Sequence, residues 1–256
     1  MKPNLICISM TLLAMAFAAE AAGADLTQPI VSSDLVFEEQ DGVVAVEAEH
    51  FYQQTLTHKR AWYITSAKAA PDLTPDADPP HVAGASGGAY VEILPDTRAT
   101  DKDKLIAGEN FSSEPGRMAV LHYKVHFHNP GRYYLWVRAY STGAEDNGVH
   151  VGLDGQWPES SQRWQTVQKR SWAWDSKQRT EQVHTGEPFK LFLDVEKAGE
   201  HEIMFSLRED GFEMDKFLLA RNKEFKPDGT GPAPKVKSGR LPPAFAEVKE
   251  AADTQK

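Results

Sequence analysis

Beyond its first 24 residues this chain has no cysteine, since the only one, Cys7, lies in the apolar N-terminal segment. An internal disulfide of the remaining chain is therefore excluded, and its stability must come from a core or a bound metal. Long apolar runs are also missing after the first residues, so we expect no membrane insertion. Cys7 lacks the small-residue approach that is usual at a lipid-attachment cysteine.

Basic charge is scarce as well. The chain carries 28 Lys and Arg residues against 37 Asp and Glu residues, a formal net charge of −9. The bulk field of such a protein disfavours nucleic acid and anionic membranes, so we expect neither as a partner. An anionic sugar held by a local group of arginines stays compatible with this charge.

The N-terminus has the features of an export signal. Lys2 supplies a positive charge, Leu5 to Ala19 form an apolar stretch, and Ala22-Gly23-Ala24 is a small-residue cleavage pattern. The sequence thus predicts a signal peptide over residues 1–24 and a secreted or periplasmic protein. Residues 25–42 are then an N-terminal lead-in.

A convincing helical period is absent, and short apolar runs alternate with Gly, Pro, Asn and Asp from Val43 onwards. Turn signals such as Asn129-Pro130-Gly131 separate these runs. The pattern predicts an all-β fold, an antiparallel β-sandwich or jelly roll over residues 43–221. The expected strands are Val43–Glu49, Ala61–Thr65, Ala89–Leu94, Ala119–Phe127, Arg132–Ser141, Gly148–Leu153, Trp164–Val167, Phe189–Val195, His201–Arg208 and Phe212–Ala220.

Two segments depart from this compact spacing. Residues 70–117 are long, polar and rich in Pro, Asp and Gly, which is typical of a functional or poorly ordered inserted loop. Residues 222–256 have many Pro, Lys, Ala and Glu residues and few large apolar ones, which predicts a disordered C-terminal tail.

An acidic group connects the two ends of the predicted sandwich. Glu47 and Glu49 are two positions apart, so on an extended strand both carboxylates project from one face. If the late strand lies beside this one, Asp215 joins them and completes an oxygen-rich site suited to Ca²⁺. The alternative is three solvated acids in a chain that is rich in acids.

Five segments resemble, in the right order, the motifs of carbohydrate-binding modules of families 6 and 35. They are Glu47-Ala48-Glu49-His50-Phe51, Asn129–Arg138, Trp172-Ala173-Trp174, Ala198–Ile203 and Glu213-Met214-Asp215. The chain also resembles an accessory domain at the C-terminal end of some α-glucuronidases. The resemblance implies a β-sandwich with a structural Ca²⁺ held by Glu47, Glu49 and Asp215, and a partner that is a polysaccharide or oligosaccharide.

The same resemblance implies a sugar site in loops at one end of the sandwich. Trp172 stands at the aromatic position, and Glu213 stands where asparagine is usual; a carboxylate accepts hydrogen bonds but does not donate them. Loop residues nearby complete the predicted ligand-binding set, which is Trp172, Glu213, Arg208, Asp210, Asn147 and Trp157. Arg208 could hold a uronate or sulfate, or form a salt bridge to a neighbouring acid. For Trp172 and Trp157 both sugar contact and core packing stay open.

Two enzymatic functions are alternatives, although the sequence does not single out a set of catalytic residues for either. A jelly-roll polysaccharide lyase could draw its base and its carboxylate-neutralising group from Tyr134, Tyr140, Arg138, His126 and His128. A glycoside hydrolase could use a pair among Glu145, Asp146, Glu209, Asp210 and Glu213, but no spacing selects one. The main prediction is therefore a secreted, non-catalytic carbohydrate-binding protein, and a structural or partner-binding surface protein is the third alternative.

Overall fold

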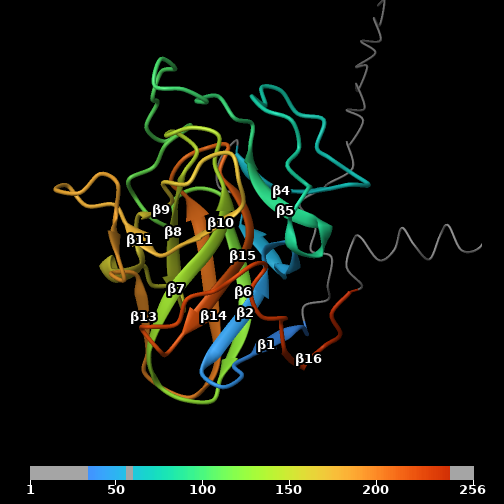
Figure 1. The fold of residues 1–256 in the computed structure, drawn as a ribbon, viewed down its shortest axis with the longest axis vertical. Coiled ribbons are helices and arrows are strands. Elements are labelled where there is room, and N and C mark those ends of the chain that lie inside the picture. The colour runs from blue at the N-terminus through green and yellow to red at the C-terminus, as the bar shows by residue number, and fades with distance from the viewer. Residues whose placement is uncertain (1–33, 56–59, 243–256) are drawn as a thin grey trace, which may run out of the picture.

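The structure is a computed structural model that describes residues 34–55 and 60–242 (Figure 1). The predicted signal peptide and residues 25–33 lie outside the described residues. Within the described part, strands dominate and helical structure is limited to three 3₁₀ turns, Ala48–His50 (η1), Ser86–Gly88 (η2) and Glu159–Ser161 (η3). None of these turns is long or apolar enough to cross a bilayer.

The first sheet has the order β12-β11-β9-β8-β14-β6-β1-β16, and β3 also pairs with β6. Its pairs are antiparallel except β1 with β6, which is parallel. Its strands are β1 Val36–Glu38, β3 Gln53–Thr55, β6 Val120–Phe127, β8 Gly148–Leu153, β9 Trp164–Gln165, β11 Lys177–Gln178, β12 Glu187–Pro188, β14 Gly199–Leu207 and β16 Val236–Ser238.

The second sheet has the order β10-β7-β15-β5-β4, with β13 added on β7 and β2 on β15. All of these pairs are antiparallel. Its strands are β2 Val43–Glu47, β4 Ala61–Ser66, β5 Ala89–Leu94, β7 Gly131–Tyr140, β10 Ala173–Asp175, β13 Phe192–Val195 and β15 Glu213–Ala220.

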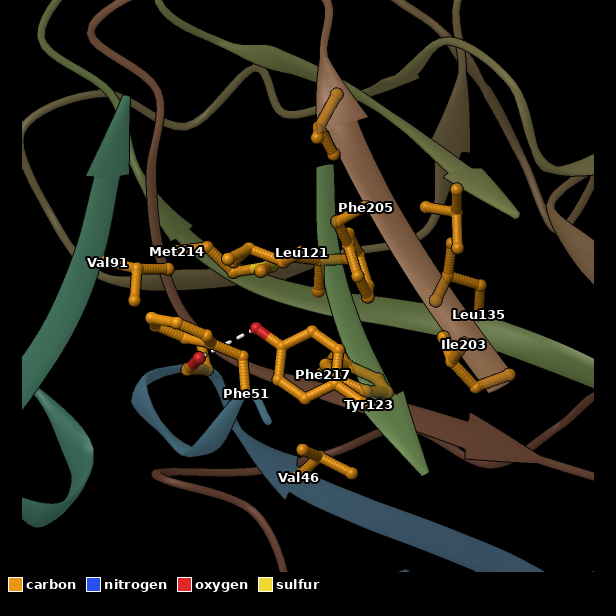
Figure 2. Packing of buried hydrophobic residues seen from close by; sticks show 14 of the residues in the cluster. Val46, Phe51, Val91, Leu121, Tyr123, Leu135, Ile203, Phe205, Met214 and Phe217 are labelled. Carbon is orange, nitrogen blue, oxygen red and sulfur yellow. Dashed lines mark hydrogen bonds between the residues drawn. The ribbon is translucent and has the colours of Figure 1, made fainter. Parts of the chain in front are cut away.

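The core lies between the two sheets and follows the strand period of two. On β6, alternate residues from Leu121 to Phe127 are fully buried, while the residues between them are half-buried. Figure 2 shows Tyr123 of this strand against Phe217 of β15, with ring centroids 5.0 Å apart. The Tyr123 hydroxyl donates to Ala48 O at 2.7 Å, so the polar end of this core ring is satisfied. The predicted β-sandwich is confirmed.

The strand predictions hold where a clear turn bounds a long run. β5 and β8 have the predicted bounds, and the predicted β4, β6, β7, β9, β13, β14 and β15 differ by a few residues at their ends. One local prediction is wrong: β2 ends at Glu47, and Glu49 lies in η1. The side-by-side strand geometry of Glu47 and Glu49 therefore does not exist, although both side chains are buried.

The predicted disordered tail over residues 222–256 is wrong for residues 222–242. Val236 and Ser238 of β16 pair with β1, and Phe225 packs on a small apolar cluster outside the second sheet. Trp174 belongs to that cluster, and its indole Nε1 donates to Gly229 O at 3.0 Å. Residues 243–256 lie outside the described residues.

The inserted segment 70–117 contributes to the sheet and to one end of the molecule. It contains η2 and β5, and its loops rise above the sandwich at the top of Figure 1. A bridge from Phe111 to Glu209 connects its second half to the segment between β14 and β15. The insertion thus forms part of the loop end on which the candidate sites lie.

Candidate functional site

The three acids predicted to hold calcium lie together where β2, η1 and β15 meet. Ser86 connects two of them: its Oγ donates to Glu47 Oε1 at 2.9 Å, and its backbone N–H donates to Asp215 Oδ1 at 2.6 Å. Antiparallel pairing of β15 with β2 brings together two strands that are far apart in the sequence and sets Lys216 opposite Glu47. Glu49 is 1% exposed, so this is an interior cluster.

Two cations contact this cluster. Lys216 Nζ donates to Glu47 Oε1 at 2.8 Å, and Arg138 Nη1 donates to Asp215 Oδ2 at 2.6 Å. Burial and the charge of Glu47 raise the pKa of Glu49 well above its usual range. The second carboxylate oxygens of Glu47 and Glu49 are buried without a hydrogen-bond partner among the described residues. Lys216 and Arg138 balance the charges of Glu47 and Asp215, and the raised pKa of Glu49 favours its neutral form. What remains for a cation at this cluster is the pair of partnerless carboxylate oxygens.

Of the two tryptophans predicted for sugar stacking, only Trp172 lies in a second group of rings adjacent to this cluster, together with His81, Tyr140 and Tyr90. The His81 ring stacks on Tyr140 with centroids 3.7 Å apart, and Trp172 packs edge-on against Tyr140 and Tyr90. The Trp172 indole donates to His81 O at 2.9 Å, and His81 Nδ1 lies 2.8 Å from Glu213 Oε1. The structure thus brings Trp172 and Glu213 together, but Glu213 is only 2% exposed.

Acids from the inserted loop surround Glu213. Ligand atoms of Asp78, His81 and Glu213 lie within 4.8 Å of one another, and so do those of Asp76, Asp78 and Glu92. Burial and neighbouring acids raise the pKa of Glu92 and of Glu213 well above their usual range. Burial raises the pKa of Asp78 to about 6, against the opposing effect of His81.

Arg208 and Asn147 line a different hollow at the same loop end, a half-open cavity of about 370 Å³. Three arginines from distant parts of the chain meet there: Arg98 from the insertion, Arg179 after β11, and Arg208 after β14. The cavity wall is formed by Arg98, Leu105, Phe111, Ala144, Glu145, Asn147, Gln165, Arg179, His184, Arg208 and Glu209.

The charges of this arginine pocket leave one cation in excess. Arg98 pairs with Glu145 and Arg208 with Glu209, so three arginines against two glutamates give +1 in a chain of net charge −9. Arg179 has no salt bridge within the described residues. Burial and the positive charge of Arg208 lower the pKa of Arg179, the direction expected of crowded cations.

The other two predicted ligand residues lie elsewhere. Asp210 is fully buried and accepts hydrogen bonds from Arg60 Nε at 3.0 Å and from Thr97 N at 2.8 Å, so it stabilises the loop end from inside. Trp157 is half-buried and lines a separate cavity of about 620 Å³ that also contains Asp154 and His201. The six predicted residues therefore do not converge on one open surface.

The residues weighed for catalysis are dispersed too. His126 and His128 belong to β6 and its following turn in the first sheet, where they contact Lys237 and Glu38. Tyr140 and Arg138 are on β7 in the second sheet, and the Arg138 guanidinium donates a hydrogen bond to Asp215. No lyase constellation forms from this set within the described residues.

Several residues of these sites had no signal in the sequence. His81 and Asp78 are in a polar loop without periodicity, and Arg98 and Arg179 are not part of any recognisable sequence motif. Their grouping depends on long-range strand order, which a single sequence does not specify. The excess of acids in residues 70–80 was the one visible hint.

Comparison with known proteins gives the family. Residues 81–234, more than half of the chain, match the glycosyl hydrolase family 115 C-terminal domain. This chain belongs to that family. It is therefore a carbohydrate-active domain with a β-sandwich fold.

Relatives of this glycosyl hydrolase family 115 C-terminal domain include an uncharacterized protein of Formosa agariphila, 50% identical over 235 residues. The match covers 91% of this chain but 57% of that protein, so the chain spans little more than half of its relative's length.

Solved structures with a similar fold are more distant. A β-(1,4)-mannanase of Podospora anserina with a family 35 module matches with a TM-score of 0.42 and 15% identity, over 73% of this chain and 29% of that one. A Paenibacillus xanthan lyase matches with a TM-score of 0.36 and 13% identity, over 74% and 14%.

The residues matched by the family model include some of the candidate site residues and leave out others. It includes the arginine pocket, His81, Glu213 and Asp215, but begins after Asp76 and Asp78 and after the Glu47–Glu49 segment. In each acidic group, some residues therefore lie outside the matched range: Glu47 of β2 and Glu49 of η1 in one, and Asp76 and Asp78 of the inserted loop in the other.

Proposed function

We propose that this domain binds an acidic polysaccharide without cleaving it, and that the arginine pocket holds a uronate carboxylate of the chain. The excess positive charge of the pocket in an acidic protein is the observation that carries the proposal. A volume of about 370 Å³ lies within the usual range for small-molecule sites, roughly 300–1,000 Å³.

Arg179 is the expected anchor for the carboxylate. Its guanidinium has no salt-bridge partner among the described residues, and the planar group matches a carboxylate with two parallel hydrogen bonds. The Arg208 guanidinium is stacked 5.1 Å from the Phe111 ring centroid and is already paired with Glu209. Its role is therefore to form part of the pocket wall and to add positive charge near the carboxylate. Polar contacts to hydroxyl groups would come from Asn147 and Gln165.

Apolar surface beside the arginines suits the C–H face of a sugar ring. Leu105 lines the pocket and is 45% exposed, and its neighbour Ile106 is 37% exposed. These two are the only large hydrophobic side chains with such exposure in the described part of the chain. Exposed apolar surface next to converging polar groups is typical of a binding site.

The resemblance to family 6 and 35 modules supports the same function and suggests one further property, a bound calcium ion. A Ca²⁺ bound by Glu47, Glu49 and Asp215 would act as a structural ion, tying β2 to β15. The partnerless oxygens of Glu47 and Glu49 fit this role. The N-terminal signal supports a secreted or periplasmic location, where soluble polysaccharide is accessible.

Affinity electrophoresis with wild type, Arg179→Gln and Arg170→Gln tests the site. Gels containing a uronate-bearing polysaccharide should retard wild type and Arg170→Gln, because Arg170 is exposed and outside the pocket. Arg179→Gln should lose affinity by about 10-fold or more, the usual effect of one lost charged hydrogen bond.

The same gels include a neutral, a uronate-bearing and a sulfated polymer. Equal retardation of both variants by the uronate polymer would contradict the assignment of the pocket. Retardation by sulfated polymer alone would replace uronate by sulfate as the recognised anion. New unsaturated or reducing ends after incubation would contradict binding without cleavage.

A further inference from the structure

We propose that Asp78, His81 and Glu213 bind a first-row divalent metal ion such as Zn²⁺ or Mn²⁺. This site shares no residue with the arginine pocket. It is also separate from the Glu47, Glu49 and Asp215 group, with which it shares no ligand.

The three side chains already have the spacing of a metal site. His81 Nδ1 lies 2.8 Å from Glu213 Oε1 and 4.0 Å from Asp78 Oδ2, and one ligand atom of each residue falls within 4.8 Å of the others. Ligands bound tetrahedrally at 2.0–2.2 Å are roughly 3.3–3.5 Å apart, so small side-chain shifts suffice. Asp78 and His81 lie three residues apart in the inserted loop, and Glu213 at the start of β15 reaches them across the fold.

An independent observation points to a missing partner. Glu213 is 2% exposed, and its Oε2 is buried without any hydrogen-bond partner in the described structure. A buried carboxylate oxygen without a partner is costly, and native proteins satisfy such atoms with a donor, a water or an ion. The two oxygens of one carboxylate are bonded to the same carbon, so the partnerless Oε2 lies beside the Oε1 atom that contacts His81 Nδ1.

The surrounding charge is negative and unneutralised. A second acidic trio, Asp76, Asp78 and Glu92, shares Asp78 with the proposed ligands. None of Asp76, Asp78, Glu92 and Glu213 has a Lys or Arg salt-bridge partner within the described residues. A divalent cation would offset this charge at the place where the acids are most crowded.

The donor set favours a first-row metal over calcium. Calcium prefers a shell of oxygen ligands, whereas an imidazole nitrogen with carboxylates suits zinc, manganese and related ions. His81 is held in position: its backbone N–H donates to Tyr90 Oη at 3.1 Å, its carbonyl accepts from Trp172 at 2.9 Å, and its ring stacks on Tyr140. Such support fixes the direction of a ligand ring.

Three protein ligands leave coordination positions for water or for an oxygen of a bound ligand. Asp78 and His81 have side chains 20% and 14% exposed, so the ion would be reached from the solvent side of the loop. The buried Glu213 would hold it from below.

Isothermal titration calorimetry with ZnCl₂ tests the proposal on the metal-stripped secreted chain, in excess Ca²⁺ so that the calcium group is occupied. Wild type should bind one Zn²⁺ per chain. His81→Gln and Asp78→Asn should each weaken binding by at least about 100-fold, because losses in the outer shell alone already cost 10–100-fold. Circular dichroism and the unfolding midpoint check that both variants fold.

Matched controls separate this site from adventitious surface binding. Asp72→Asn removes an exposed acid from the same loop, and His128→Gln removes one of two neighbouring surface histidines; both should keep the wild-type affinity. Wild-type affinity in folded His81→Gln, or no Zn²⁺ or Mn²⁺ binding by wild type, would overturn the proposal. Arg179→Gln should bind Zn²⁺ with wild-type affinity, because Arg179 is not a proposed metal ligand. The metal proposal can therefore hold or fail independently of the sugar proposal.

Discussion

Buried polar side chains gather at the loop end, and His150 is one whose polar atoms are fully paired. His150 is fully buried, its Nε2 donates to Ser112 O at 3.0 Å, and its Nδ1 accepts from Arg163 N at 3.3 Å. This arrangement requires a neutral imidazole, since both ring nitrogens would carry protons in the charged form. Glu213 Oε2, in contrast, has no partner among the described residues, and it is the atom to which we assign a metal ion.

The neutral state of His150 predicts acid sensitivity. Burial, together with the positive charges of Arg208 and Arg163, lowers its pKa to about 4, against the opposing hydrogen bond to Ser112. Because the unfolded chain binds the proton more tightly, the stabilisation is complete above about pH 6.5 and is lost as the pH falls toward 4. Over that pH range, the contribution of His150 to the free energy of unfolding falls by about 3 kcal/mol.

The measurement compares His150→Gln with wild type in urea unfolding at pH 7 and pH 4.5. Glutamine keeps a donor for Ser112 and cannot titrate, so the free energy of unfolding should fall less on acidification than in wild type. An equal fall in both proteins would show that other groups carry the acid sensitivity.

At the scale of single elements, long alternating strands were predictable and short ones were not. β6 and β8 have apolar alternation and clear turns on both sides, which fixes their bounds in the sequence. β10, β11 and β12 have two or three residues each and exist only because a neighbouring strand pairs with them. Glu49 illustrates the same limit, because a 3₁₀ turn replaces the expected continuation of β2.

The C-terminal segment gives the clearest element-scale prediction. β16 pairs with β1, while Val236 and Leu241 pack against the main core. Removing residues 235–256 should lower the free energy of unfolding by about 2 kcal/mol or more, from lost apolar burial and strand hydrogen bonds. Thermal unfolding measures the change.

The control for this truncation is a chain that ends after Pro242 and keeps every strand of the structure. It should unfold close to the full-length midpoint. If the two truncations unfold at the same temperature as the full chain, β16 contributes nothing and the pairing with β1 is marginal.

At the scale of the whole molecule, one acidic cluster joins segments that are far apart in the sequence. Glu47 comes from β2 and Asp215 from the last long strand, so a cation held there closes the sandwich across more than 160 residues of sequence. The sequence was sufficient to propose this group, since a motif order preserved along the chain implied it. The arginine pocket was not predictable, because its three arginines meet only through the order of the strands.

A bound Ca²⁺ at this cluster predicts chelator sensitivity. An ion present at 100 times its dissociation constant stabilises the fold by about 2.7 kcal/mol, which corresponds to a midpoint shift of about 5–10 °C for a domain of this size. Wild type should lose this stability in EGTA and recover it when Ca²⁺ is added back. Glu49→Gln should unfold at the same temperature with and without Ca²⁺, and calcium-dependent unfolding of this variant would contradict the proposed ligand set.

The central claim is that the pocket of Arg98, Arg179 and Arg208 recognises the carboxylate of an acidic sugar. Calorimetric titration of the wild-type protein with a uronate-bearing oligosaccharide, and with the same oligosaccharide after reduction of its carboxyl groups, tests this claim most directly. We expect measurable binding of the acidic form, weakened by added salt, and at least about 10-fold weaker binding of the reduced form. Equal binding of the two forms, or binding of neither, would contradict the claim.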